Sequence, residues 1–112
     1  MATRAYVKRS GISAIKMRRV ADLVRGKNAD EAMIMLKFVT TPAAGLVAKT
    51  IRSAVANAEN NDLKDRAKLK IVKITVDGGP RTRRFRAKAR GRAGAFDRPS
   101  SHLTVEVDEG QE

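Results

Sequence analysis

The chain has 112 residues, and its 24 lysines and arginines outnumber its 12 aspartates and glutamates, for a formal net charge of +12. That length is typical of a single domain, and an apolar content of 42% is enough for one core. The absence of cysteine excludes disulfides, thiolate metal sites and a cysteine nucleophile, and a lone histidine excludes a histidine-rich metal centre. With neither a membrane span nor a secretion signal in the sequence, we expect a cytoplasmic protein without a cofactor whose partner is a polyanion.

The first predicted elements are a short strand and a helix. The strand covers about 3–8, and the amphipathic helix covers 14–25, with an N-cap at Ser10 or Ser13 and its end at Gly26. Lysines and arginines occupy the outer face of the helix, whereas its apolar positions follow the i, i+3, i+4, i+7 spacing of a core-facing stripe: Met17, Val20, Ala21 and Val24.

Two more helices follow. The second is short, is capped by Asn28 or Asp30, passes through Ala32, Met35, Leu36 and Val39, and ends before Thr40. The third has Thr41 as its N-cap and Pro42 as its first residue, and it ends at Asn60 to Asp62. Its apolar stripe is Ala44, Val47, Ala48, Ile51, Ala54, Val55 and Ala58, and the bulky residues predicted to fill the core are Met17, Met33, Met35 and Phe38.

Two strands are predicted in the second half of the chain, and they should pair antiparallel. In the first, over 70–76, alternation places Val72, Ile74 and Val76 on one face. In the second, over 102–107, it places Leu103, Val105 and Val107 on one face and His102, Thr104 and Glu106 on the other. The fold class is therefore α+β, as a single domain over 1–112 that ends in a short acidic tail at 108–112.

Positive charge is concentrated in two segments that surround a nearly neutral middle. Residues 1–27 and residues 81–98 each carry eight basic side chains against a single aspartate. Because nucleic acid is the commonest cytosolic polyanion, we predict that both segments contact it. The candidate residues are Arg4, Lys8, Arg9, Lys16, Arg18, Arg19, Arg25 and Lys27 in the first segment, and Arg81, Arg83, Arg84, Arg86, Lys88, Arg90, Arg92 and Arg98 in the second.

The segment 78–101 is too long and too polar to be an ordinary connection. Its only large apolar residues are Phe85 and Phe96, and from Arg84 to Arg92 every second residue is basic. In extended chain this spacing places cations on one face and small residues on the other. We predict a β-hairpin that projects ~30 Å from the body, at ~3.3 Å per residue; the alternative is a solvated basic loop.

Catalytic, metal-binding and DNA-binding roles are less well supported by the residues. His102 lacks a predicted partner for general-base chemistry, so an RNA-contacting or surface histidine is favoured over a nuclease. Asn57, Glu59 and Asn60 could be metal ligands, but the end of a helix favours capping. A β-armed nucleoid protein would also be small and basic, although it would dimerise and bind DNA.

Three stretches of the sequence resemble the bacterial-type large-subunit ribosomal protein L22 family. They are KMRRVADLVRGK over 16–27, AVANAENND over 54–62, and a third that joins Gly79-Pro80, Arg83-Arg84, ARGRA over 89–93 and HLTV over 102–105. Ala87-Lys88 departs from the Pro-Arg usual in the family.

The resemblance implies three helices on a three-stranded antiparallel sheet, a long protruding hairpin, and no enzymatic activity. It also implies that the protein binds large-subunit rRNA, bridges rRNA domains during assembly, contacts neighbouring ribosomal proteins, and does not form a homo-oligomer. The hairpin is expected to line the nascent-peptide tunnel, with its tip at about 88–92. The implied tunnel residues are Thr82, Arg83, Arg84, Lys88, Ala89, Arg90, Gly91 and Arg92.

Overall fold

A computed structural model describes residues 2–8, 10–79, 82–87 and 93–109. In chain order the elements are β1 (Thr3–Val7), α1 (Ala14–Val24), α2 (Ala29–Leu36), α3 (Pro42–Asn60), a 3₁₀ turn η1 (Arg66–Lys68), β2 (Leu69–Gly78), β3 (Thr82–Ala87), β4 (Ala93–Arg98) and β5 (Ser101–Glu109).

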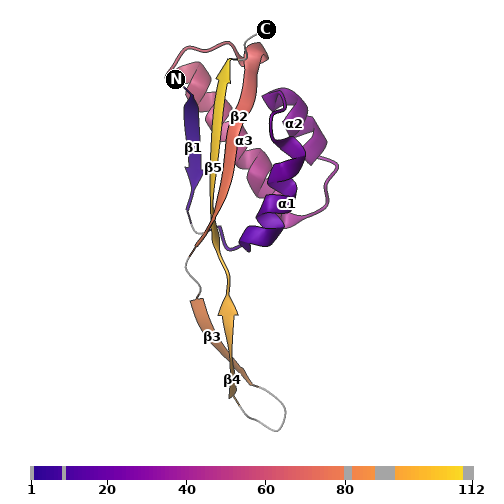
Figure 1. Ribbon diagram of the computed structural model, residues 1–112, viewed down its shortest axis with the longest axis vertical. Helices are drawn as coiled ribbons and strands as arrows, with labels where there is room; N and C mark the ends of the chain where they lie inside the picture. Colours follow the sequence, from indigo (N-terminus) through magenta and orange to yellow (C-terminus); the bar gives the residue numbers. More distant parts are fainter. Residues whose placement is uncertain (1, 9, 80–81, 88–92, 110–112) are drawn as a thin grey trace.

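A three-stranded antiparallel sheet with the order β1-β5-β2 forms one layer of the body, and the helices form the other. In Figure 1, α3 lies behind the sheet, while α1 and α2 lie at the side of β2. The second sheet, formed by β3 and β4, extends below the body as a separate ribbon. The structure confirms the predicted α+β class with three helices and a three-stranded sheet.

Local sequence explains where the helices begin and end. Ser13 caps α1, Asn28 caps α2 and Thr41 caps α3, each through a side-chain oxygen that accepts a backbone N–H of the first turn. Pro42 occupies the start of α3, where a missing N–H costs nothing. After α1, Gly26 has a φ of +79°, a left-handed conformation that glycine adopts without steric penalty.

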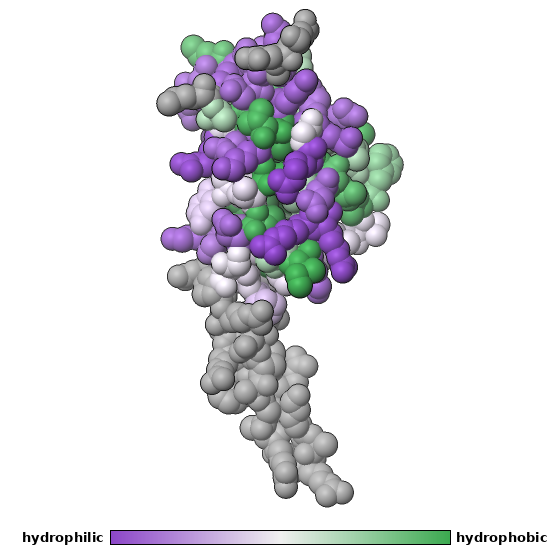
Figure 2. All heavy atoms as spheres, viewed as in Figure 1, coloured by the Kyte–Doolittle hydropathy of each residue, from purple (hydrophilic) through white to green (hydrophobic). Residues whose placement is uncertain are grey.

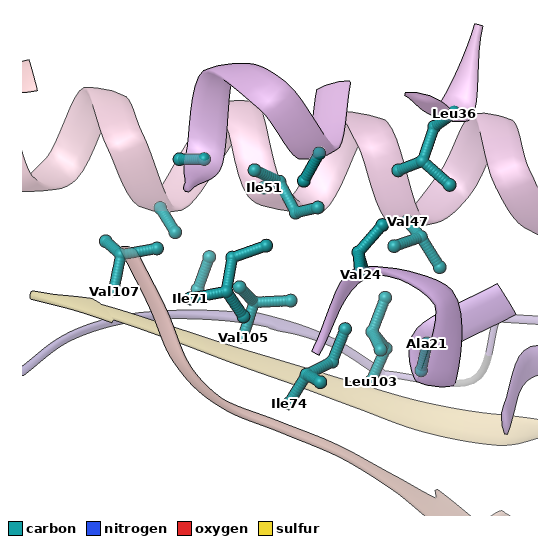
Figure 3. Packing of buried hydrophobic residues seen from close by; sticks show 14 of the residues in the cluster. Ala21, Val24, Leu36, Val47, Ile51, Ile71, Ile74, Leu103, Val105 and Val107 are labelled. Atoms are coloured by element: carbon teal, nitrogen blue, oxygen red, sulfur yellow. The ribbon is translucent and has the colours of Figure 1, made fainter. Parts of the chain in front are cut away.

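The core is formed between α3 and the sheet, with α1 and α2 closing its sides. Figure 3 shows Leu103, Val105 and Val107 of β5 directed toward Ile51 and Val47 of α3. All five are 0% exposed. Small residues on the same face of α3 let the helix approach the sheet closely, since their side chains occupy little space: Ala44, Ala54 and Ala58.

The predicted face of β2 was wrong at one residue because the strand contains a β-bulge. Ile71 pairs with Val107 and Lys73 with Glu106, so Val72 is an extra residue between two adjacent pairs. Ile71 is buried in its place, and Val72 is 54% exposed. Alternation with a period of two cannot reveal a bulge, because the extra residue moves the side chains on its N-terminal side to the face opposite the one that alternation assigns to them.

The second helix is shorter than predicted, and one predicted core residue lies on the surface. Backbone bonds from Lys37 to Ile34 and from Phe38 to Met35 tighten the chain into a 3₁₀-type turn after Leu36. Phe38 therefore leaves the helix and is 82% exposed, contrary to the prediction. Of the other predicted core fillers, Met17 is fully buried, and Met33 and Met35 are half-buried.

Candidate nucleic-acid interface

Helix α1 turns its cations outward because its apolar stripe is fully used by the core. The four residues predicted for that stripe are all buried. Three of the remaining positions on the helix carry exposed basic side chains, which are Lys16, Arg18 and Arg19, and Arg25 follows at the C-cap. Near them in sequence, Arg4 and Lys8 are exposed and Lys27 is half-buried, whereas Arg9 lies outside the described residues.

Two of these arginines also bind the free edge of the sheet. Arg18 donates from Nη2 to the carbonyl of Val76 at 3.1 Å, and Arg25 donates from Nη1 to the carbonyl of Ile74 at 2.6 Å. Because β2 is an edge strand, these carbonyls have no neighbouring strand to pair with. The guanidinium groups therefore cover the edge and fix α1 against it.

Lys16 and Arg19 differ from those two arginines, since neither makes a side-chain hydrogen bond or ion pair within the part of the chain that the structure describes. Both line a cavity of about 680 Å³ between the first turns of α1 and α3 and the chain that enters β5. Its lining residues are Gly11, Ile12, Ser13, Lys16, Arg19, Val20, Thr41, Pro42, Ala43 and Pro99.

A serine cluster joins the segment before α1 to the start of β5, at the root of the hairpin. Ser10 donates its backbone N–H to the carbonyl of Ser101 at 2.9 Å, and the two hydroxyl oxygens are 3.0 Å apart. Ser101 is 0% exposed, and its hydroxyl donates to the carbonyl of Ile12 at 2.8 Å. Ser10 was predicted only as a cap, because contacts across 91 residues leave no local signature.

The hairpin consists of β3 and β4, paired antiparallel from Thr82↔Arg98 to Ala87↔Ala93. Arg83, Arg84 and Arg86 lie on β3, and Arg98 lies on the paired strand β4. The other predicted contacts in this segment lie outside the described residues: Arg81, Lys88, Ala89, Arg90, Gly91 and Arg92.

The open face of the sheet carries charges of both signs rather than an excess of cations. Register places Arg4, Glu106 and Lys73 side by side across the three strands. His102 is half-buried on the same face, and its ring lies 6.1 Å from that of Tyr6, between centroids. Figure 2 shows hydrophilic side chains over much of the visible body, with apolar patches between them.

Two of the three residues considered as metal ligands have other contacts. The Asn57 side chain donates to the carbonyl of Arg4 at 3.3 Å, which joins α3 to β1, and Glu59 Oε1 lies 3.8 Å from Arg66 Nε. No cluster of three histidines, cysteines or carboxylates that could hold a metal occurs among the described residues. None of the described helices is long and apolar enough to cross a membrane.

Asp108, a carboxylate at the end of the sheet, has a shifted pKa. Lys64 Nζ lies 3.1 Å from Asp108 Oδ1. The hydrogen bond from Lys64, together with one from the Glu109 backbone, lowers the pKa of Asp108 below its ordinary value. Lys64 also donates to Thr3 Oγ1 at 3.1 Å, so the pair links β1, β5 and the loop after α3.

The body is α+β, a β-ribbon extends from it, and exposed cations of α1 lie near the root of that ribbon. This is the architecture of a structural nucleic-acid-binding protein. Residues 5–108 match a family model described as ribosomal protein L22p/L17e. The chain therefore belongs to the ribosomal protein L22 family, whose members are structural, non-enzymatic constituents of the large ribosomal subunit, as the resemblance predicted.

Individual relatives agree over almost the whole chain. The large ribosomal subunit protein uL22 of Dehalococcoides mccartyi strain 195 is 48% identical over 107 residues, which are 96% of this chain and 98% of the relative. The protein of the same name from Pediococcus pentosaceus is 47% identical over 108 residues, or 96% of this chain and 92% of the relative.

Replacing Arg25 tests whether the arginines at the sheet edge contribute to folding. Arg25→Gln removes the hydrogen bond to Ile74 and the 3.1 Å ion pair with Asp22, so we expect a loss of about 1 kcal/mol in the free energy of unfolding. Arg19→Gln, on the same helix, should change it by less than about 0.5 kcal/mol. Urea denaturation of the two variants measures both values, and equal losses would contradict the assignment.

The Asp108–Lys64 pair should make stability depend on pH. A carboxylate whose pKa is lowered in the folded state contributes stability that is present above its unfolded pKa and is lost as the pH falls through the folded value. The difference in urea midpoint between the parent and Asp108→Asn should therefore be constant above about pH 5 and shrink below about pH 4. Lys64→Gln and the double variant complete the cycle, and a difference independent of pH would refute the pairing.

Proposed function

We propose that this protein binds large-subunit rRNA through the outer face of α1, the strand before it and the basic hairpin, and thereby holds rRNA domains together during assembly. The observation that carries the proposal is the location of Lys16 and Arg19, which have no side-chain partner among the described residues, at the root of a basic ribbon. The proposed contacts are Arg4, Lys8, Arg9, Lys16, Arg18, Arg19, Arg25, Lys27, Arg81, Arg83, Arg84, Arg86, Lys88, Arg90, Arg92, Arg98 and His102.

The shape of the molecule supports contact with RNA at a distance from the body. A compact chain of this length has a radius of gyration of about 13 Å. The observed value is 16.9 Å, and the longest dimension is 63 Å against 26 and 18 Å for the others. An isolated two-stranded ribbon gains little from packing, so a ribbon rich in cations is best explained by an anionic partner that surrounds it.

The second part of the proposal concerns the end of the ribbon. We infer that the hairpin lines the nascent-peptide tunnel through Thr82, Arg83, Arg84 and the residues of its tip, with the body at the outer surface of the subunit near neighbouring ribosomal proteins. Support comes from family membership and from the position of Thr82 to Arg84 on one strand of the projecting ribbon. The small residues Ala89 and Gly91 at the tip would let the backbone lie close to the tunnel wall.

The salt dependence of RNA binding tests the hairpin. Each phosphate contact contributes about 0.7 to 0.9 to the slope of log K against log salt, so seven hairpin contacts contribute about 5 to 6. Replacing Arg81, Arg83, Arg84, Arg86, Lys88, Arg90 and Arg92 by glutamine should reduce the slope by that amount for a large-subunit rRNA transcript.

Two controls accompany that measurement. Circular dichroism should show an intact body, since the buried cluster is formed by residues of the three helices and of β1, β2 and β5. The variant Lys49→Gln/Arg52→Gln, on the exposed face of α3, should change the slope little. Tighter binding of the parent to duplex DNA than to the transcript would contradict the proposal.

A crosslinking experiment tests the tunnel assignment. Because the chain has no cysteine, Ala89→Cys introduces a unique thiol that can carry a benzophenone label before the protein is reconstituted into large subunits. Irradiation during translation of a radiolabelled peptide should attach the nascent chain to this protein. Ala56→Cys, on the exposed surface of α3, is the control and should give no adduct. If active ribosomes that carry the labelled Ala89→Cys variant give no adduct, the tunnel role is refuted.

A further inference from the structure

The cavity at the root of the hairpin is a candidate binding site for a defined ligand. It occupies about 680 Å³, within the range of ~300 to 1,000 Å³ that is typical of pockets for small ligands. Its walls come from three parts of the chain that are distant in sequence: the segment from Gly11 to Val20, the segment from Thr41 to Ala43, and Pro99. The serine cluster holds two of these walls together, since Ser10 and Ser101 join the segment before α1 to β5.

The lining combines an apolar interior with cations and contains no carboxylate. Ile12, Val20, Pro42, Ala43 and Pro99 supply apolar surface. Lys16 and Arg19 are exposed side chains of the lining and have no ion-pair partner among the residues that the structure describes. This composition fits a ligand that has a flat, largely apolar part and a negative part.

We propose that the cavity binds a single unpaired nucleotide of rRNA, with its base against the apolar wall and its phosphate between Lys16 and Arg19. This inference rests on the proposed function and adds to it a specific ligand at a specific place. RNA-binding proteins read single strands by accepting bases that have left the helical stack, on apolar surfaces, aromatic rings or guanidinium planes. Arg19 can stack on a base, and Lys16 can contact the phosphate as a point charge.

The hydroxyl groups in the wall limit the sequence preference that such a site can show. Ser13 Oγ accepts the N–H of Lys16 at 3.4 Å, and Thr41 Oγ1 accepts the N–H of Ala44 at 3.3 Å. Each hydroxyl therefore keeps its hydrogen for donation to a carbonyl or ring nitrogen of a base. Since all four bases carry such acceptors, we expect the site to distinguish nucleotides weakly.

Blocking the cavity without changing charge is the central test. Pro42 is exposed at the mouth of the cavity, so Pro42→Trp fills it with an indole while every cation is kept. Ala56→Trp adds the same ring to an exposed position of the same helix and serves as the control. We expect Pro42→Trp to weaken binding to a large-subunit rRNA transcript about fivefold to tenfold at constant salt, as loss of one base contact predicts, and Ala56→Trp to have no effect.

A charge variant with a matched control tests the phosphate contacts. Lys16→Gln/Arg19→Gln and Lys49→Gln/Arg52→Gln each remove two cations spaced three residues apart on an exposed helix face. Only Lys16 and Arg19 line the cavity. In the Lys16→Gln/Arg19→Gln background, Pro42→Trp should therefore have no further effect on rRNA binding, whereas in the Lys49→Gln/Arg52→Gln background its effect should remain.

NMR titration of the full chain with adenosine monophosphate identifies the ligand directly. The amides of Gly11, Ile12 and Ser13 should shift with the nucleotide and not in Pro42→Trp. Equal shifts with inorganic phosphate alone would overturn the proposal in favour of a plain anion site. Unchanged rRNA binding by Pro42→Trp, with poor incorporation of that variant into large subunits, would overturn it in favour of a protein partner. If the parent itself does not bind rRNA, the proposed function fails instead.

Discussion

The antiparallel ladder between β2 and β5 is the interaction on which the rest of the structure depends. β5 is the central strand, and its inward side chains Leu103, Val105 and Val107 are completely buried. The ladder continues beyond the core, where Gly79 donates its N–H to the carbonyl of Ser100 at 2.9 Å. A Cβ at Gly79 would lie 3.2 Å from the Ser100 backbone, so glycine permits this close approach. The same pairing that closes the core therefore sets the direction in which the hairpin leaves it.

From β2 to β3 the chain carries one more residue than the strand paired with it at two places. The bulge at Val72 reverses which backbone groups point to the free edge. Before it, the N–H of Ile71 donates to the carbonyl of Lys27; after it, the carbonyls of Ile74 and Val76 accept from arginines. A second offset lies between the pairs Gly78↔Ser101 and Thr82↔Arg98.

Helix caps, buried helix faces and the antiparallel pairing of β2 with β5 were predicted correctly, whereas a bulge and a helix end were not. The caps Ser13 and Thr41 and the buried stripe of α1 follow from side-chain chemistry and helical period, and both are confirmed. The bulge at Val72 and the exposure of Phe38 depend on pairing and on where a helix ends, which periodicity does not determine. At the candidate interface, basic residues were found by charge alone. Their division into arginines bound to β2 and cations without a partner among the described residues required the structure.

That division changes how the net charge of +12 relates to RNA binding. A guanidinium has five N–H donors, so Arg18 and Arg25 can satisfy carbonyls of β2 and still present donors to a phosphate. Their positions are fixed by the fold, and little side-chain entropy remains for a ligand to remove.

Lys16 and Arg19 lack such restraints and lose rotamer freedom on binding, at a cost of about 0.5 to 1.5 kcal/mol each. A further interaction that offsets that cost therefore strengthens phosphate contact at these two residues. The apolar wall of the cavity beside them supplies one, because burying a base there removes apolar surface from water.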